Sequence, residues 1–121
     1  MRVYSDIDEE RERLVVTFVG TVTMDDIAEM TRTSRVARML HFQLLCDARK
    51  AAVTMAGDDL PRFQAMVREL ALQSRLGQTA VVVARETDLI AIDRLADLAT
   101  KFCDVRGFLE SSRAERWLGW T

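Results

Sequence analysis

Hydrophobic and polar residues follow two different periods in turn along this chain. Short runs with a period of two, typical of strands, alternate with longer stretches in which apolar residues recur every three or four positions, as in helices. Strands are predicted at Arg2–Ile7, Leu14–Thr21, Phe42–Asp47, Thr79–Ala84 and Val105–Leu109. A short charged turn separates the first two, which favours a β-hairpin.

Four helices are predicted between and after these strands, and each is preceded by residues that suit a helix start. The starts are Thr23, then Asp58 or Asp59, then Thr87 with Asp88, and finally Ser112, which opens a capping box ending at Glu115. The first helix is expected to run to about Leu40, with Ile27, Met30, Ala37 and Leu40 inward. Gly77 fits a stop after the second helix, Phe102 and Cys103 are expected on the inner face of the third, and the last should end near Trp117.

This order of elements predicts an α/β fold. An N-terminal β-hairpin is followed by repeated βα units, which gives a mostly parallel five-stranded sheet with four helices, because strands that alternate with helices are joined by right-handed crossovers. The nearly continuous apolar run Thr79–Ala84 is typical of a strand buried on both faces. No linker rich in Gly, Ser or Pro interrupts the chain, so residues 1–121 are expected to form one domain.

Composition and charge narrow the choice of function. The chain has 49% hydrophobic and 30% charged residues and a formal net charge of −2. Because its basic residues do not cluster, nucleic-acid binding is not expected. Its apolar runs are too short to span a membrane and its N-terminus does not resemble a signal peptide, so the cytoplasm is the expected location.

Chemically reactive side chains are few and isolated. His41, the only histidine, is expected in a surface loop at the amino end of the sheet, whereas open α/β sheets bind ligands at the carboxyl ends of their strands. Cys46 and Cys103 fall on apolar faces without a second cysteine at metal-ligand spacing. The acid pairs Asp25–Asp26 and Asp58–Asp59 suit helix starts. We therefore expect a non-enzymatic protein without a metal or a cofactor.

Three segments carry a family resemblance. Val15–Thr23 opens the first βα unit, Phe42–Arg49 contains a central strand ending in Asp47, and Ala114–Leu118 lies in the closing helix. With this order of elements, the chain resembles the STAS superfamily, which includes bacterial anti-sigma-factor antagonists and the cytoplasmic domains of sulfate transporters. It looks most similar to small stand-alone bacterial relatives with a SpoIIAA-like fold. The resemblance implies a domain that acts by binding a protein partner or a second copy of itself.

One departure from that family concerns its regulation. Anti-sigma-factor antagonists carry a phosphorylatable serine at the start of the helix that follows the central strand. The corresponding stretch here, Met55–Asp58, holds no serine, and Thr54 is the nearest hydroxyl. The resemblance therefore implies the fold without the phosphorylation switch.

Two groups of residues are candidates for a binding site. Ala48–Gly57 is predicted to be a loop that is long and unusually apolar, and it either covers the core or meets another molecule. Because the partners of anti-sigma-factor antagonists dock beside the equivalent loop, we favour an interaction surface made by Arg49, Lys50, Val53, Thr54, Met55 and Asp58. A second candidate lies on the rim where strands end. It consists of Asp47, Arg85, Thr87 and Asp88, for which capping and salt bridging is the alternative.

Two functional hypotheses remain open at this point. The first is a non-enzymatic protein-interaction or regulatory module that forms a homodimer or binds a protein partner. The second is a small-ligand or lipid-binding domain, in which the many Met and Leu side chains line a cavity. Trp120, beyond the last helix, either marks an interface or folds back on the core.

Overall fold

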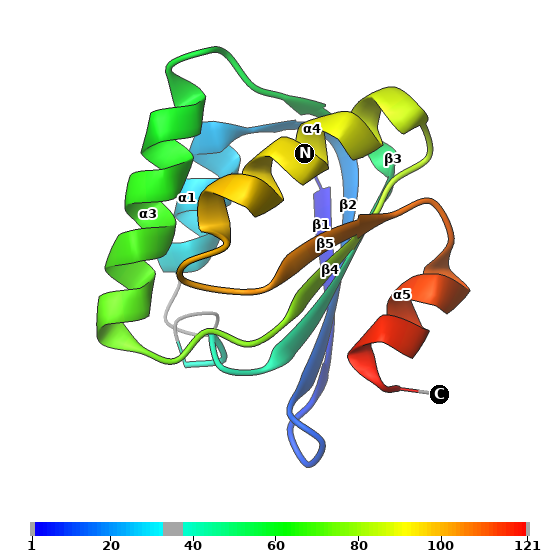
Figure 1. Cartoon of the computed structure of the whole chain (residues 1–121). Helices are drawn as coiled ribbons and strands as arrows, with labels where there is room; N and C mark the ends of the chain where they lie inside the picture. Colours follow the sequence, from blue (N-terminus) through cyan, green and yellow to red (C-terminus); the bar gives the residue numbers. More distant parts are fainter. Residues whose placement is uncertain (1, 33–37, 121) are drawn as a thin grey trace.

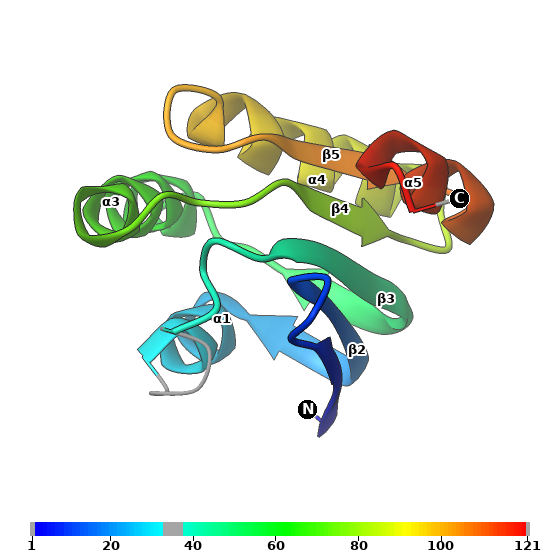
Figure 2. The same cartoon turned by 90° about the horizontal axis from the view of Figure 1, so that it is seen from below.

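A computed structural model describes residues 2–32 and 38–120, which form a sheet covered by helices on both faces (Figures 1 and 2). The strands are β1 (Arg2–Asp8), β2 (Arg13–Thr23), β3 (Gln43–Thr54), β4 (Thr79–Val82) and β5 (Val105–Phe108). The helices are α1 (Met24–Arg32), α3 (Asp59–Gln73), α4 (Glu86–Ala99) and α5 (Ser111–Leu118).

The sheet has the predicted class and topology. Its five strands lie in the order β1-β2-β3-β4-β5. β1 pairs antiparallel with β2 in a hairpin, and every other pairing is parallel. Helices α1, α3 and α4 lie on one face of the sheet and α5 lies on the other (Figures 1 and 2). The predicted α/β fold with an N-terminal hairpin is thus confirmed.

The pairing of β2 with β3 is the longest in the sheet, and it contains a bulge. Its first run ends at Thr17 opposite Asp47, and its second begins at Val19 opposite Lys50, so β3 carries one residue more than β2 between the two runs. Within β2, Gly20 comes just after the bulge and has a φ of 98°, a backbone conformation that favours glycine. Both strands continue beyond the bulge, to Thr23 and Thr54.

This bulge explains why the prediction of a loop over Ala48–Gly57 is wrong. Residues 48–54 belong to β3, and only Met55–Asp58 joins that strand to α3. At the bulge, Arg49 and Lys50 are both exposed, whereas Ala48 before them is only 4% exposed. Two successive exposed charges break the period of two that would have revealed a strand.

Several helix boundaries differ from the predictions. Residues 38–41 form turns, so the first helix does not reach Leu40, and Ala37 lies outside the described residues. α4 ends at Ala99, whose carbonyl accepts hydrogen bonds from the backbone N–H groups of Phe102 and Cys103 in the turn that follows. α5 begins at Ser111, one residue before the predicted capping box, and its N-cap Glu110 makes no side-chain capping bond.

A capping box forms at α1 instead. The Thr23 backbone N–H donates to the Asp26 carboxylate (2.9 Å), and the Asp26 N–H donates to the Thr23 hydroxyl (3.2 Å). The bond from the Thr23 backbone, followed by that from its hydroxyl, lowers the pKa of Asp26. The box fixes the direction in which the chain leaves β2 and enters α1.

The last turn of the chain packs on the sheet. Trp120 is half-buried, and its indole N–H donates to the Gln43 side-chain oxygen at 2.8 Å. The amide nitrogen of Gln43 donates to the Leu118 carbonyl at 2.7 Å and to the Gln78 side chain at 2.8 Å. Of the two alternatives for Trp120, the structure shows the one in which it folds back on the core.

Gly77 marks a close approach between two backbones. Its N–H donates to the Leu40 carbonyl at 2.9 Å, and a Cβ at this position would lie 2.1 Å from the Phe42 carbonyl oxygen. α3 already ends at Gln73 with Ser74 as its C-cap, so the glycine is required by this contact rather than by the end of the helix.

We predict that Gly77→Ala lowers the free energy of unfolding by about 2 kcal/mol or more, because the new methyl group meets backbone atoms that cannot rotate away. Gly57→Ala is the matched control, since no atom lies within 4 Å of a Cβ there, and it should be neutral or stabilising by about 0.4–1 kcal/mol. Urea denaturation of both variants measures the difference, and equal loss of stability in the two would contradict the close approach.

Candidate functional site

A cavity of about 210 Å³ lies between the sheet and the helices on its more heavily covered face. β2 and β3 contribute Phe18, Leu44 and Cys46 to its lining, α1 contributes Ile27 and Met30, and α3 contributes Phe63, Met66 and Val67. The prediction that Ile27 and Met30 point inward is confirmed. The cavity therefore lies beneath the two helices that directly follow the paired strands β2 and β3.

The lining is almost wholly apolar. Among the described residues that form it none is charged, and Thr31 and Thr79 supply its only hydroxyl groups. The Thr31 hydroxyl is already bonded to the Ala28 carbonyl at 2.9 Å. A buried water molecule needs two to four polar partners, so a cavity lined in this way stays dry.

An empty cavity of this size has a large energetic cost. Residual volume in fully buried cavities of core mutants costs about 24 cal/mol per Å³, which sets an upper bound of roughly 5 kcal/mol for a space of 210 Å³. The net stability of a whole domain is only about 5–15 kcal/mol. An apolar molecule that fills the space would therefore add van der Waals contacts and stabilise the folded protein.

Both cysteines line the cavity as neutral thiols. Burial raises the pKa of the Cys46 thiol to about 12. Burial, together with the nearby Asp104 carboxylate, also raises the pKa of Cys103. Since the thiolate is the nucleophilic form of cysteine, these side chains act here as small apolar groups.

The predicted rim residues form two local ion pairs. The Arg49 guanidinium donates from Nε (3.0 Å) and Nη2 (2.8 Å) to the two carboxylate oxygens of Asp47. These hydrogen bonds lower the pKa of Asp47 and raise that of Arg49. Arg85 donates to Asp88 at 3.2 Å, and Thr87 is exposed at the start of α4. Asp47 does not end its strand, because β3 runs on to Thr54, and a ligand site at this rim stays a prediction.

The predicted interaction surface divides into two sets of residues. Its polar members, Arg49, Lys50, Thr54 and Asp58, are exposed. Its apolar members are half-buried and turned toward the core: Val53 lines the cavity, and Met55 packs against the cluster that contains Ala48 and Val83. As a surface for a partner this group also stays a prediction, and its polar members are the ones available to solvent.

Other chemistry is sparse in the part of the chain that the structure describes. His41 lies in a turn before β3, with its Nε2 atom 2.8 Å from a Glu12 carboxylate oxygen. Across residues 2–32 and 38–120, no cluster of three or more His, Cys, Asp or Glu side chains is placed to hold a metal ion. None of the described helices has the length and apolar character needed to cross a membrane.

Comparison with known proteins identifies the fold. A crystal structure of an uncharacterized DUF3478-family protein from Shewanella loihica PV-4, which has a SpoIIAA-like fold, matches with a TM-score of 0.55. The match covers 97% of this chain and 92% of that chain, at 17% sequence identity. This chain has a SpoIIAA-like fold. The SpoIIAA-like fold predicted from the sequence is thereby confirmed.

The amino-acid sequence shows less similarity to known proteins than the fold does. No protein-family model matches it, and no curated protein does either. At 17% identity the SpoIIAA-like neighbour shares the fold with this chain, and the residues of the site must supply any argument about function.

The raised pKa of Cys46 predicts a specific dependence of stability on pH. The unfolded thiol ionises from about pH 8.5, whereas the folded thiol keeps its proton up to about pH 12, so above pH 8.5 the unfolded state binds fewer protons. Stability should therefore fall by about 1.4 kcal/mol per pH unit relative to Cys46→Val, which lacks this group. Urea denaturation of both proteins between about pH 7 and pH 10 tests the difference. Parallel stability curves over this range would show that the thiol is not buried.

Proposed function

We propose that this STAS-type domain is a non-enzymatic binding module and that its ligand is a small, uncharged, apolar molecule held in the cavity. The observation that supports the proposal most is the combination of size and lining: about 210 Å³, lined by apolar side chains, without a charged group among the described residues. Pockets for small molecules are characteristically concave, mostly apolar and few in a protein.

The size of the cavity limits the ligand. An engineered cavity of about 150 Å³ holds benzene, so 210 Å³ corresponds to a molecule of about eight to ten non-hydrogen atoms. A substituted benzene ring or a short alkyl chain has this size, whereas the chains of a membrane lipid exceed it.

The lining limits the charge of the ligand. An ionised group placed in the cavity would lose its hydration and find no charged partner there, and isolated buried charges are strongly disfavoured. Flexible thioether side chains of Met30, Met39 and Met66 can adjust to apolar molecules of different shapes. The proposal is therefore a site that selects by polarity and volume more than by a fixed pattern of hydrogen bonds.

Binding of a protein partner or of a second copy is the other candidate function. The observation that favours it lies beyond the bulge, where Lys50, Ala52 and Thr54 are exposed on successive outward positions of β3 and extend past the last residue paired with β4. Beside these residues, the ion pair between Asp47 and Arg49 holds one negative and one positive charge in place. Regulation by phosphorylation at the family's serine is not part of this proposal, since Met55–Asp58 contains no serine.

We predict that para-fluorotoluene, with about eight non-hydrogen atoms, binds one site with a dissociation constant on the order of 1 mM or below. The charged analogue para-fluorobenzoate should not bind, because the cavity offers its carboxylate no partner. Fluorine NMR titration measures both. Equal binding of the two molecules would locate them on the surface and contradict the proposal.

A matched pair of substitutions tests whether the cavity is the site. Val67 lines the cavity, whereas Val82, which is also buried, packs on the α5 side of the sheet. Val67→Phe should occupy the empty space, abolish binding of para-fluorotoluene and leave the melting temperature unchanged or raised. Val82→Phe has no space to fill and should destabilise the protein by about 1–3 kcal/mol. Unchanged ligand binding in folded Val67→Phe would rule out this cavity as the site.

A further inference from the structure

A second hollow lies directly outside the cavity. It is a solvent-facing groove between α1 and α3, whose lining includes Ala28, Arg62 and Glu69. Thr31, Met66 and Leu70 line the groove as well as the cavity. These three half-buried side chains therefore form a partition between the two, one residue in thickness.

The partition is held by weak contacts. The Thr31 hydroxyl lies 3.8 Å from the Met66 sulfur, which is a poor hydrogen-bond acceptor. Methionine has three rotatable side-chain bonds and changes its conformation easily. Rotation of Met66 together with a small movement of α1 would open the groove into the cavity.

The other walls of the cavity are more firmly built. The sheet wall consists of strands joined by backbone hydrogen bonds along their length, with one interruption at the bulge between β2 and β3. On the α4 side, Ile92 and Leu95 are only 5% and 6% exposed within one apolar cluster. Within α1 only Met24 and Ala28 are buried, and within α3 only Val67 is. Both helices bury fewer residues than α4, so the seam between them loses less on opening than the α4 wall would.

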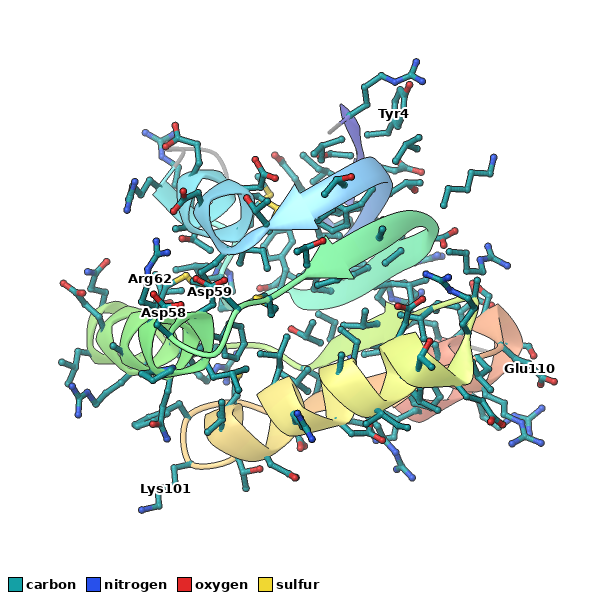
Figure 3. All side chains as sticks on the ribbon, turned by 90° about the horizontal axis from the view of Figure 1, so that it is seen from above. Tyr4, Asp58, Asp59, Arg62, Lys101 and Glu110 are labelled. Atoms are coloured by element: carbon teal, nitrogen blue, oxygen red, sulfur yellow. The ribbon has the colours of Figure 1, made fainter. Side chains whose placement is uncertain are left out.

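Arg62 joins α1 to α3 at one end of this seam. Arg62 of α3 donates to the Asp25 carboxylate of α1 at 2.7 Å and to the Asp59 carboxylate of its own helix at 3.2 Å. Figure 3 shows Arg62 and Asp59 at the start of α3, on the side that faces α1. The hydrogen bond to Asp25 is the first of the causes that raise the pKa of Arg62.

We infer that the apolar ligand reaches the cavity between α1 and α3, through the partition of Thr31, Met66 and Leu70, and that the Arg62–Asp25 ion pair keeps this seam closed. The inference rests on the proposed function. Arg62 is here a positioning residue: it lines the outer groove, is not among the residues that line the cavity, and is expected to affect the rates of binding rather than the affinity.

The experiment compares Arg62→Gln with the wild type by fluorine exchange NMR with para-fluorotoluene. If the pair closes the seam in both free and bound protein, its loss makes the open form more frequent in both. Association and dissociation rates should then rise together by about two- to fivefold, the range expected for an exposed ion pair, while the dissociation constant stays within about a factor of two.

Arg68→Gln is the matched control, because Arg68 is an exposed arginine of the same helix and is absent from both the cavity lining and the groove lining. It should leave both rates unchanged. Salt provides a second test: raising the ionic strength from about 0.05 M to about 1 M should accelerate exchange in the wild type and have no such effect in Arg62→Gln. Asp25→Asn should reproduce the effect from the α1 side of the pair.

The outcomes separate the two proposals. Unchanged rates in Arg62→Gln, with binding intact, would overturn this route and leave the cavity as the site. A rise in the dissociation rate alone, with weaker affinity, would also overturn it, because Arg62 would then stabilise the ligand complex itself. Absence of binding to the wild type would overturn the proposed function and with it the route.

Discussion

The parallel pairing of β2 with β3 is the constraint on which the rest of this structure depends. This pairing is longer than that of β3 with β4 and that of β4 with β5, and it continues past a bulge to Thr23 and Thr54. α1 starts directly after β2, and a connection of four residues separates the end of β3 from the start of α3. Since the two strands end at paired positions, the two helices begin side by side and run back along the same face of the sheet, as Figure 2 shows. The capping box of Thr23 and Asp26 and the ion pair of Arg62 and Asp25 both secure this start.

The cavity is a consequence of this arrangement. The opposite face of the sheet is filled by one short amphipathic helix, α5, whose Ala114 and Leu118 are completely or almost completely buried against β3 and β4. The other face is covered by α1, α3 and α4, and the side chains that meet there leave about 210 Å³ between them. The described residues that line this space include no charged group and only two with hydroxyls, so we expect it to exclude water. An apolar ligand that binds there would then gain the free energy of burying its own apolar surface.

The sequence predicted the fold in more detail than the cavity, for a physical reason. The number, order and type of the elements follow from local periodicity, and all five strands were located within a few residues of their ends except β3. Its second half was hidden because the bulge at Arg49 and Lys50 interrupts the alternation. The sequence pattern indicates the cavity less clearly than it indicates the strands and helices. The many Met and Leu side chains suggested one, but whether residues as distant in sequence as Met30 and Met66 enclose a space depends on the separation of their helices, which no local pattern records.

The central claim is that this SpoIIAA-like domain contains a dry apolar cavity able to hold a small molecule, and crystals under xenon pressure test it most directly. Xenon enters apolar cavities without needing a polar partner. The account predicts a bound xenon atom between the β2–β3 pair and helices α1 and α3, in contact with Met30, Met66 and Val67. It also predicts that Val67→Phe crystals lack this atom. Ordered water in that space, or side chains that fill it without any ligand, would contradict the account.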